Sequence, residues 1–199
     1  FCTGVVPAIS SIVKRVTNVG DRVVLQTPVY DIFFHSVENA GRVVSESPLI
    51  YENGTYRADF EDLEHKLADP LATMMILCNP HNPVGKIWTR EELATVGALC
   101  KKHGVTLLSD EIHCDLTDPG AEYVPFASVS AECREVGVTC LSASKAFNLA
   151  GLQSAAVAVP EEHLRAKVVR GLNSDEVAEP NCFAALATVA AFREGGDWL

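Results

Sequence analysis

VGVTCL-SASK, residues 136–145, is the stretch of this sequence that decides the fold. Residues 136–141 are mostly apolar and predict a buried strand, and Ser142-Ala143-Ser144-Lys145 follows that strand directly. In open α/β sheets, ligands bind beyond the carboxyl ends of the strands. A lysine and two serines at such an end are therefore candidate site residues.

The same combination of an apolar strand and a polar cluster occurs three more times along the chain. The clusters are Thr27-Pro28-Val29-Tyr30 after residues 22–27, Cys78-Asn79-Pro80-His81-Asn82-Pro83-Val84-Gly85 after residues 72–77, and Asp110-Glu111-Ile112-His113 after residues 105–109. Because the carboxyl ends of parallel strands share one edge of a sheet, we expect all four clusters to converge there.

Helical patterns separate these strands. One begins at Thr89 with the capping-box order Thr-x-x-Glu and ends before Gly104. Strands that alternate with helices predict an α/β fold, a three-layer αβα arrangement with a mostly parallel sheet. The link from Lys145 to a strand expected at residues 153–159 is too short for a parallel crossover, so we expect one antiparallel strand.

Composition narrows the classes of function. The chain has 199 residues, a net charge of −10 and a pI near 5.0, with no run of Lys or Arg, which argues against nucleic acid and anionic membrane as partners. No apolar stretch approaches the roughly 18 residues of a membrane span. Seven cysteines without a CxxC pattern predict reduced, mostly buried thiols in a cytoplasmic protein. Cys78 with His81, or His113 with Cys114 and Asp115, forms no complete metal-ligand set, so we expect no metal.

We interpret the chain as one domain, residues 1–199. It begins at Phe1 and ends at Asp197-Trp198-Leu199, in what looks like an unfinished helix. These ends indicate a fragment of a longer polypeptide.

Lys145 lies directly beyond a buried strand, where we expect its side chain to be poorly solvated. Desolvation favours the neutral amine, the form that makes a Schiff base. Ser142 and Ser144 supply hydroxyl groups that can bind a phosphate at the same place. A structural lysine whose ammonium group reaches water is the alternative for Lys145 taken alone. The neighbouring hydroxyls favour the interpretation that Lys145 forms a Schiff base with a phosphorylated cofactor.

The other clusters contain groups suited to a flat, cationic ring. Asp110 can hold a proton on a ring nitrogen, or it can be a helix cap or a surface ion pair. Asn82, in a loop stiffened by Pro80 and Pro83, can direct an amide at a ligand or belong to an ordinary turn. Tyr30 can stack on a ring or be a core aromatic residue.

A helix predicted at residues 5–16 offers the free backbone N–H groups of Val5 and Val6 at its start. Such a helix start suits a phosphate, although every helix has one.

Together the four motifs, the last of which continues through Ala146-Phe147-Asn148-Leu149-Ala150-Gly151-Leu152, resemble those of the fold-type I pyridoxal-phosphate (PLP) enzymes of the aminotransferase class I/II superfamily. The similarity covers essentially the whole chain. Pro80-His81-Asn82-Pro83, Asp110-Glu111-Ile112-His113 and residues 145–152 look most like the MalY/PatB branch, which contains cystathionine β-lyases and related C–S lyases.

The resemblance implies a role for each candidate residue and a PLP-binding large domain that lacks most of the small domain. Lys145 would form the Schiff base and move the α-proton, and Asp110 would pair with the pyridine nitrogen. Asn82 would bind the phenolic oxygen, with His113 beside it where many relatives have Tyr. Tyr30 would stack on the ring. Ser142, Ser144 and the backbone of Val5 and Val6 would hold the phosphate.

One position departs from many aminotransferases. Gln153 stands where they have a phosphate-binding Arg, eight residues after the lysine, which favours the lyase branch. The implied reaction is β-elimination of a thiol from cystathionine or a cysteine S-conjugate in a homodimer. The alternatives are an aminotransferase, a PLP-binding regulatory module and an inactive truncated core.

Overall fold

The computed structural model describes residues 1–199 and contains a six-stranded sheet in the order β2-β1-β5-β6-β7-β8. The strands are β1 (Arg22–Thr27), β2 (Val43–Pro48), β5 (Ala72–Cys78), β6 (Thr106–Asp110), β7 (Gly137–Leu141) and β8 (Ala156–Ala158). All neighbouring pairs are parallel except β7 and β8. The α/β fold with a mostly parallel sheet and one antiparallel strand is therefore confirmed.

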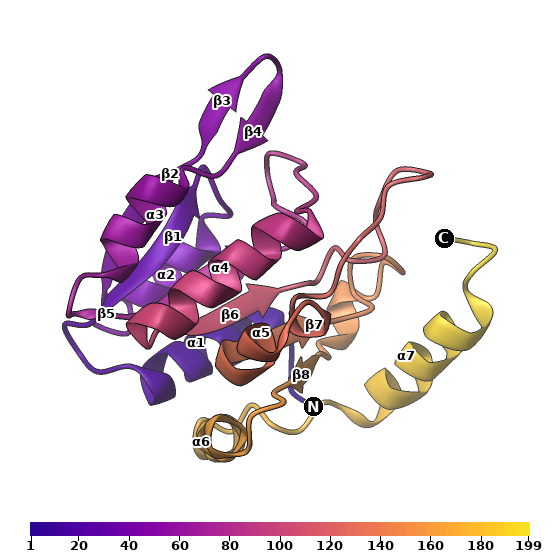
Figure 1. The fold of residues 1–199 in the computed structure, drawn as a ribbon. Helices are drawn as coiled ribbons and strands as arrows, with labels where there is room; N and C mark the ends of the chain where they lie inside the picture. The colour runs from indigo at the N-terminus through magenta and orange to yellow at the C-terminus, as the bar shows by residue number, and fades with distance from the viewer.

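Seven helices complete the three layers, as Figure 1 shows. They are α1 (Val5–Val16), α2 (Ile32–Glu38), α3 (Phe60–Leu67), α4 (Arg90–His103), α5 (Ala131–Val136), α6 (Glu162–Ser174) and α7 (Cys182–Glu194). Helices α1, α2 and α6 bury apolar residues in one core cluster, and α3, α4 and α5 do so in another. Each group of helices covers one face of the sheet.

The central strand β5 shows how the sheet serves both cores. Met74, Ile76 and Cys78 belong to the first cluster, whereas Met75 and Leu77 belong to the second. Successive side chains of a strand point to opposite faces, so a strand covered on both sides is apolar without interruption. This explains why the sequence of β5 contains no polar alternation.

Local signals set several helix ends. The Asp59 carboxylate accepts a hydrogen bond from Asp62 N at 3.1 Å, and Thr89 forms both halves of a capping box with Glu92. Gly104 ends α4 with φ 69°, a left-handed conformation that glycine adopts without strain. The start of α4 at Thr89 and its end at Gly104 agree with the sequence prediction.

Three boundaries differ from the prediction. Val136 ends α5, which the sequence did not reveal, and β7 begins at Gly137 without a connecting loop. Glycine permits this junction, because a Cβ at residue 137 would lie 2.4 Å from the Cys133 carbonyl oxygen. β8 starts only at Ala156, after a 3-10 turn η2 (Ala150–Leu152). α7 ends at Glu194, so the expected unfinished helix at the last residues is wrong.

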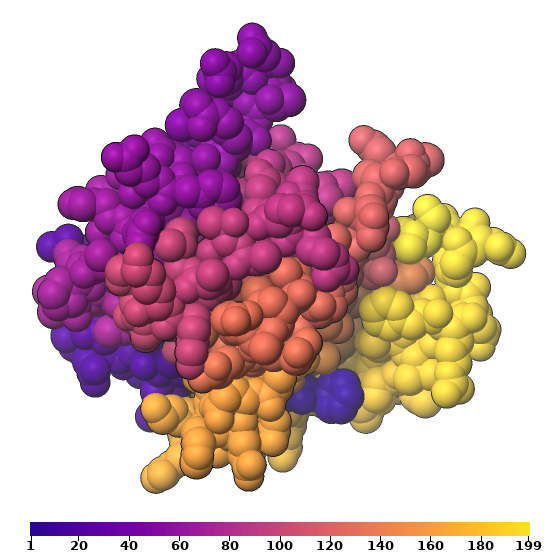
Figure 2. All heavy atoms as spheres, in the orientation of Figure 1, coloured from indigo at the N-terminus to yellow at the C-terminus, as the bar shows by residue number.

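Two peripheral features stand out in Figures 1 and 2. The hairpin of β3 (Ile50–Glu52) and β4 (Thr55–Arg57), which turns at Asn53-Gly54, projects from the body of the molecule. The N-terminus lies between α6 and α7. There Cys2 forms an antiparallel bridge with Ala155, with both N···O distances 2.9 Å. This bridge places the start of α1 beside the β7–β8 edge of the sheet.

The seven cysteines are free thiols, and five of them are buried, which agrees with the expectation of mostly buried cysteines. None of the helices has the length and apolar character that a membrane crossing requires.

Close packing between α4 and α5 gives a first prediction. A Cβ on Gly97 would lie 2.3 Å from Cys133 Sγ, so Gly97→Ala should lower the free energy of unfolding by about 1–3 kcal/mol. Denaturant unfolding measures the change. In a Cys133→Ala background the clash is absent, and the same substitution should be neutral or stabilising. An equal loss of stability in both backgrounds would contradict this explanation.

Candidate functional site

The four polar clusters lie at one edge of the sheet. They follow β1, β5, β6 and β7, which are consecutive neighbours in the sheet and run parallel. Their carboxyl ends are therefore adjacent, and the expected convergence of the clusters is confirmed. We call this edge the carboxyl rim.

Lys145 lies in the turn that follows β7. Hydrogen bonds from Phe147 N to Ala143 O and from Leu149 N to Ser144 O, both 3.0 Å, hold this turn. Phe147 packs against Phe192 of α7, with ring centroids 5.5 Å apart. The Lys145 side chain is exposed and forms no hydrogen bond or ion pair, so the expectation of a poorly solvated lysine is wrong.

The two serines before Lys145 differ in what they bind. The Ser142 hydroxyl donates to Ser154 O at 2.6 Å and accepts from Ser144 N at 3.1 Å. Its proton is thus used to join the turn to the segment before β8. The Ser144 hydroxyl forms no hydrogen bond within the chain and remains free for a ligand.

Asp110, at the end of β6, is 5 % exposed. One carboxylate oxygen accepts from Ile112 N at 3.1 Å, and the other has no hydrogen-bond donor in the protein. Burial raises the pKa of Asp110 to about 7, and the Glu111 carboxylate adds to this, whereas the Ile112 N–H and the Lys145 ammonium oppose it. A buried carboxylate with one free oxygen is suited to a cationic N–H group of a ligand.

Asn82 and Tyr30 come from the loops after β5 and β1. Asn82 is half-buried; its backbone N–H contacts Cys78 Sγ at 3.3 Å, and its side-chain amide forms no hydrogen bond. Tyr30 is also half-buried, and its ring meets the edge of Phe33 at a centroid distance of 5.9 Å. The tyrosine hydroxyl and the Asn82 amide are both free to bind a ligand.

His113 lies in the loop after β6 and is half-buried. Burial lowers the pKa of its imidazole, and the nearby Lys145 ammonium lowers it further. His113 is therefore a neutral imidazole at pH 7.

The first turn of α1 lies at the same rim. Cys2 pairs with Ala155, and the next residue, Ala156, pairs with Leu141 at the end of β7. The backbone N–H groups of Val5 and Val6 have no acceptor in the chain. These donors and the positive end of the helix dipole are available to an anion near Ser144.

Glu111 is a buried residue of the rim whose role the sequence did not reveal. It is 1 % exposed, and its carboxylate accepts from Ser109 Oγ at 2.8 Å, Phe126 N at 3.0 Å and the Tyr123 hydroxyl. Burial raises its pKa. These bonds hold the loop 111–126 that carries His113. In the sequence, the two adjacent acids Asp110 and Glu111 after an apolar strand were the signal that could have indicated this role.

This network gives a second prediction. Glu111→Ala leaves three buried or half-buried donors without an acceptor and should lower the free energy of unfolding by about 3 kcal/mol. Thermal or urea unfolding measures the loss. Glu122→Ala removes an exposed acid from the same loop and should change stability by less than about 0.5 kcal/mol. Equal effects of the two substitutions would show that the network is not stabilising.

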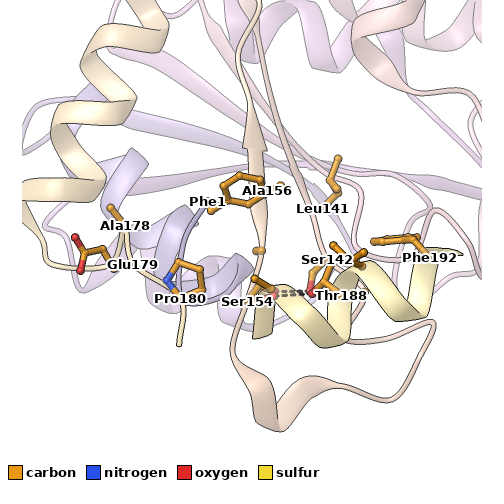
Figure 3. A pocket seen from close by; sticks show the side chains of 14 residues that line it. Phe1, Leu141, Ser142, Ser154, Ala156, Ala178, Glu179, Pro180, Thr188 and Phe192 are labelled. Atoms are coloured by element: carbon orange, nitrogen blue, oxygen red, sulfur yellow. Dashed lines mark hydrogen bonds between the residues drawn. The ribbon is translucent and has the colours of Figure 1, made fainter. Parts of the chain in front are cut away.

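Two of the cavities at the rim include candidate site residues. The smaller, about 460 Å³, is lined by Asn82, His113 and residues 115–118. The larger, about 730 Å³, is mostly apolar and lies between α7 and the ends of β7 and β8; Figure 3 shows Ser154 and Thr188 meeting across it at 3.2 Å. It includes Ser142 but not Asp110, Asn82 or Lys145. Asp110 and Lys145 line neither of these cavities, so the smaller cavity holds only Asn82 and His113 of the candidate residues.

Residues 1–195 match the sequence profile of the family described as aminotransferase class I and II. The chain belongs to this family. The resemblance drawn from the four motifs is thereby confirmed.

Two curated proteins are similar to this chain over almost its entire length. "Cystathionine beta-lyase PatB" from Bacillus subtilis is 49% identical over 199 residues, which are 100% of this chain and 51% of PatB. "Protein MalY" from Escherichia coli is 33% identical, over 98% of this chain and 50% of MalY. The resemblance to the MalY/PatB branch is confirmed.

A solved structure gives the same result for the fold. The crystal structure of cystalysin from Treponema denticola, which contains a pyridoxal 5'-phosphate cofactor, matches with a TM-score of 0.96 at 32% identity, over 99% of this chain and 50% of cystalysin. The chain thus spans about half the length of the relatives it matches.

Proposed function

We propose that this chain is the PLP-binding large domain of a carbon–sulfur β-lyase that releases a thiol from cystathionine or a cysteine S-conjugate. The observation that carries the proposal is the 49% identity to cystathionine beta-lyase PatB across all 199 residues. The free groups of the carboxyl rim support it, because they are among the groups that the family resemblance assigns to the cofactor.

The residues of the rim fit PLP in chemistry. Asp110 has one carboxylate oxygen without a donor, which suits the ring N–H. The amide of Asn82, the hydroxyl of Tyr30 and the amine of Lys145 have no partners in the protein, and so remain available to the cofactor. When bound, PLP supplies an electron sink for the electron pair that the α-proton leaves behind.

The free amides of Val5 and Val6, with the Ser144 hydroxyl, suit the phosphate group. The Ser142 hydroxyl proton is already donated to Ser154 O, so we propose that Ser142 supports the phosphate site by holding the turn. Its direct contact with phosphate, which the resemblance implies, stays a prediction. His113 is placed to assist Asn82 as a neutral hydrogen-bonding group.

In the proposed reaction the Lys145 amine removes the proton from Cα of the substrate. Sulfur then leaves Cβ with its bonding electron pair and takes up a proton to become a thiol. Water converts the remaining three-carbon unit to pyruvate and ammonia. Asp110 keeps its negative charge beside the ring nitrogen throughout, and Asn82 and Tyr30 keep the ring oriented.

One assay tests this function against its nearest alternative, an aminotransferase, which the family description also supports. The full-length protein with PLP is given cystathionine, and pyruvate and free thiol are measured with and without an added keto acid. We expect pyruvate and thiol without keto acid. Amino transfer that depends on the keto acid, without thiol release, would identify an aminotransferase. PLP binding without either reaction would identify a regulatory or inactive protein.

We further propose a homodimer in the cytoplasm, on the basis of the family resemblance and the reduced cysteines. Sedimentation of the full-length protein measures whether it is a dimer.

A further inference from the structure

His81, the residue before Asn82, joins two loops of the carboxyl rim. Its side chain is 1 % exposed, and Nε2 lies 3.0 Å from the carbonyl oxygen of Pro28. A carbonyl oxygen only accepts, so Nε2–H is the donor. No other hydrogen bond connects the loop after β5 to the loop after β1.

Trp88 fixes the orientation of the imidazole. The two rings meet edge to face, with centroids 5.6 Å apart, and the Trp88 indole N–H donates to Cys78 O at 2.9 Å. The backbone of His81 is held as well, because its N–H donates to Lys86 O and its carbonyl accepts from Gly85 N, both at 2.8 Å. The ring therefore has one orientation, with Nε2 directed at Pro28.

The ring carries a single proton. Burial lowers the pKa of His81 to about 4, against the opposing effect of the Pro28 and Gln26 carbonyls. Nδ1 is buried and forms no hydrogen bond. A neutral imidazole that donates from Nε2 leaves Nδ1 deprotonated, so the hydrogen bond to Pro28 assigns the tautomer.

We propose that His81 is a positioning residue that sets the separation between Asn82 and Tyr30, and hence the width of the slot that receives the PLP ring. This inference rests on the proposed function, since it concerns the same cofactor. Asn82 follows His81 directly, and Tyr30 lies two residues after Pro28. Neither of their side chains is held by another hydrogen bond. A shift of one loop against the other would therefore move both ligand groups of the ring.

Two substitutions separate the hydrogen bond from the packing. His81→Phe keeps a ring against Trp88 but removes the donor, whereas His81→Gln places an amide N–H where Nε2 lies. In the full-length protein we expect His81→Phe to weaken PLP binding about tenfold or more and to reduce the visible circular dichroism of the bound cofactor. His81→Gln should restore both to within about threefold. The exposed His35→Gln is the matched control and should resemble the wild type.

Binding of PLP is measured by fluorescence titration, and thermal unfolding of the cofactor-free proteins reports folding. If His81→Phe folds and binds PLP with wild-type affinity and dichroism, the inference is overturned. If His81→Phe fails to fold, His81→Asn, whose shorter amide does not reach Pro28, replaces it in the comparison with His81→Gln. Equal PLP affinity of those two variants would also overturn the inference. Failure of the wild type to bind PLP would instead reject the proposed function.

Discussion

Replacing Lys145 by Ala should abolish thiol release by the full-length protein, with a loss in kcat of roughly a thousandfold or more. The proposed reaction needs its amine both to hold the cofactor and to remove the α-proton, and general-base catalysis alone contributes about 10²–10⁴-fold. Pyruvate formation from cystathionine measures the rate. Borohydride treatment of the wild type with PLP should label Lys145, and the variant should remain unlabelled.

A second lysine serves as the control for this experiment. Lys167, an exposed residue of α6, should be replaceable by Ala with full activity. Lys145→Arg keeps a positive charge on the turn but forms no bond to the cofactor, so it should be as inactive as Lys145→Ala. Thiol release by either Lys145 variant at more than a few per cent of the wild-type rate would contradict the proposed role.

Asp110→Asn should lower kcat/KM by roughly 10²-fold or more and weaken PLP binding. The asparagine is of similar size but carries no charge, so it cannot keep a proton on the ring nitrogen, on which the electron sink depends. Asp115→Asn, in the wall of the smaller cavity, is the matched acid-to-amide control and should have a much smaller effect. Comparable losses in the two variants would show that Asp110 has no special role.

The same residue should make the stability of the cofactor-free protein depend on pH. The pKa of Asp110 is about 7 in the folded chain, against about 3.9 in an unfolded one. The unfolded chain releases this proton first, so this group lowers stability as pH rises from about 4 to 7, by up to about 4 kcal/mol. Glu111 acts in the same direction, so the comparison with Asp110→Asn isolates one carboxyl. Urea unfolding at pH 5 and pH 8 should show a smaller decrease for the variant.

The four clusters could be predicted from sequence because each is a local signal. An apolar strand followed by polar residues is visible within about ten positions, and parallel strands bring such ends together. The clusters are neighbours because β1, β5, β6 and β7 are consecutive in the sheet. The sequence implied this order only through its alternation of strands and helices. The Thr89 capping box and Gly104 are local in the same way, and the bounds of α4 agree with them.

What the sequence did not reveal depends on residues far apart. Ser142 meets Ser154 only because β8 returns antiparallel to β7, and His81 meets Pro28 across 53 positions. The solvation of Lys145 depends on what covers its turn, which no local pattern encodes. The boundary between α5 and β7 was missed because Val136, the last residue of the helix, continues directly into the apolar run of the strand.

The bridge between Cys2 and Ala155 has a consequence for how the protein is made. It joins residues 153 positions apart and brings the start of α1 to the end of β7. During synthesis Cys2 therefore remains unpaired until Ala155 and β8 have left the ribosome. Contacts of such long sequence separation close late and slowly. The phosphate-binding amides at the start of α1 are thus among the last parts to take their place, and nascent chains that end before Ala155 should bind no phosphorylated cofactor.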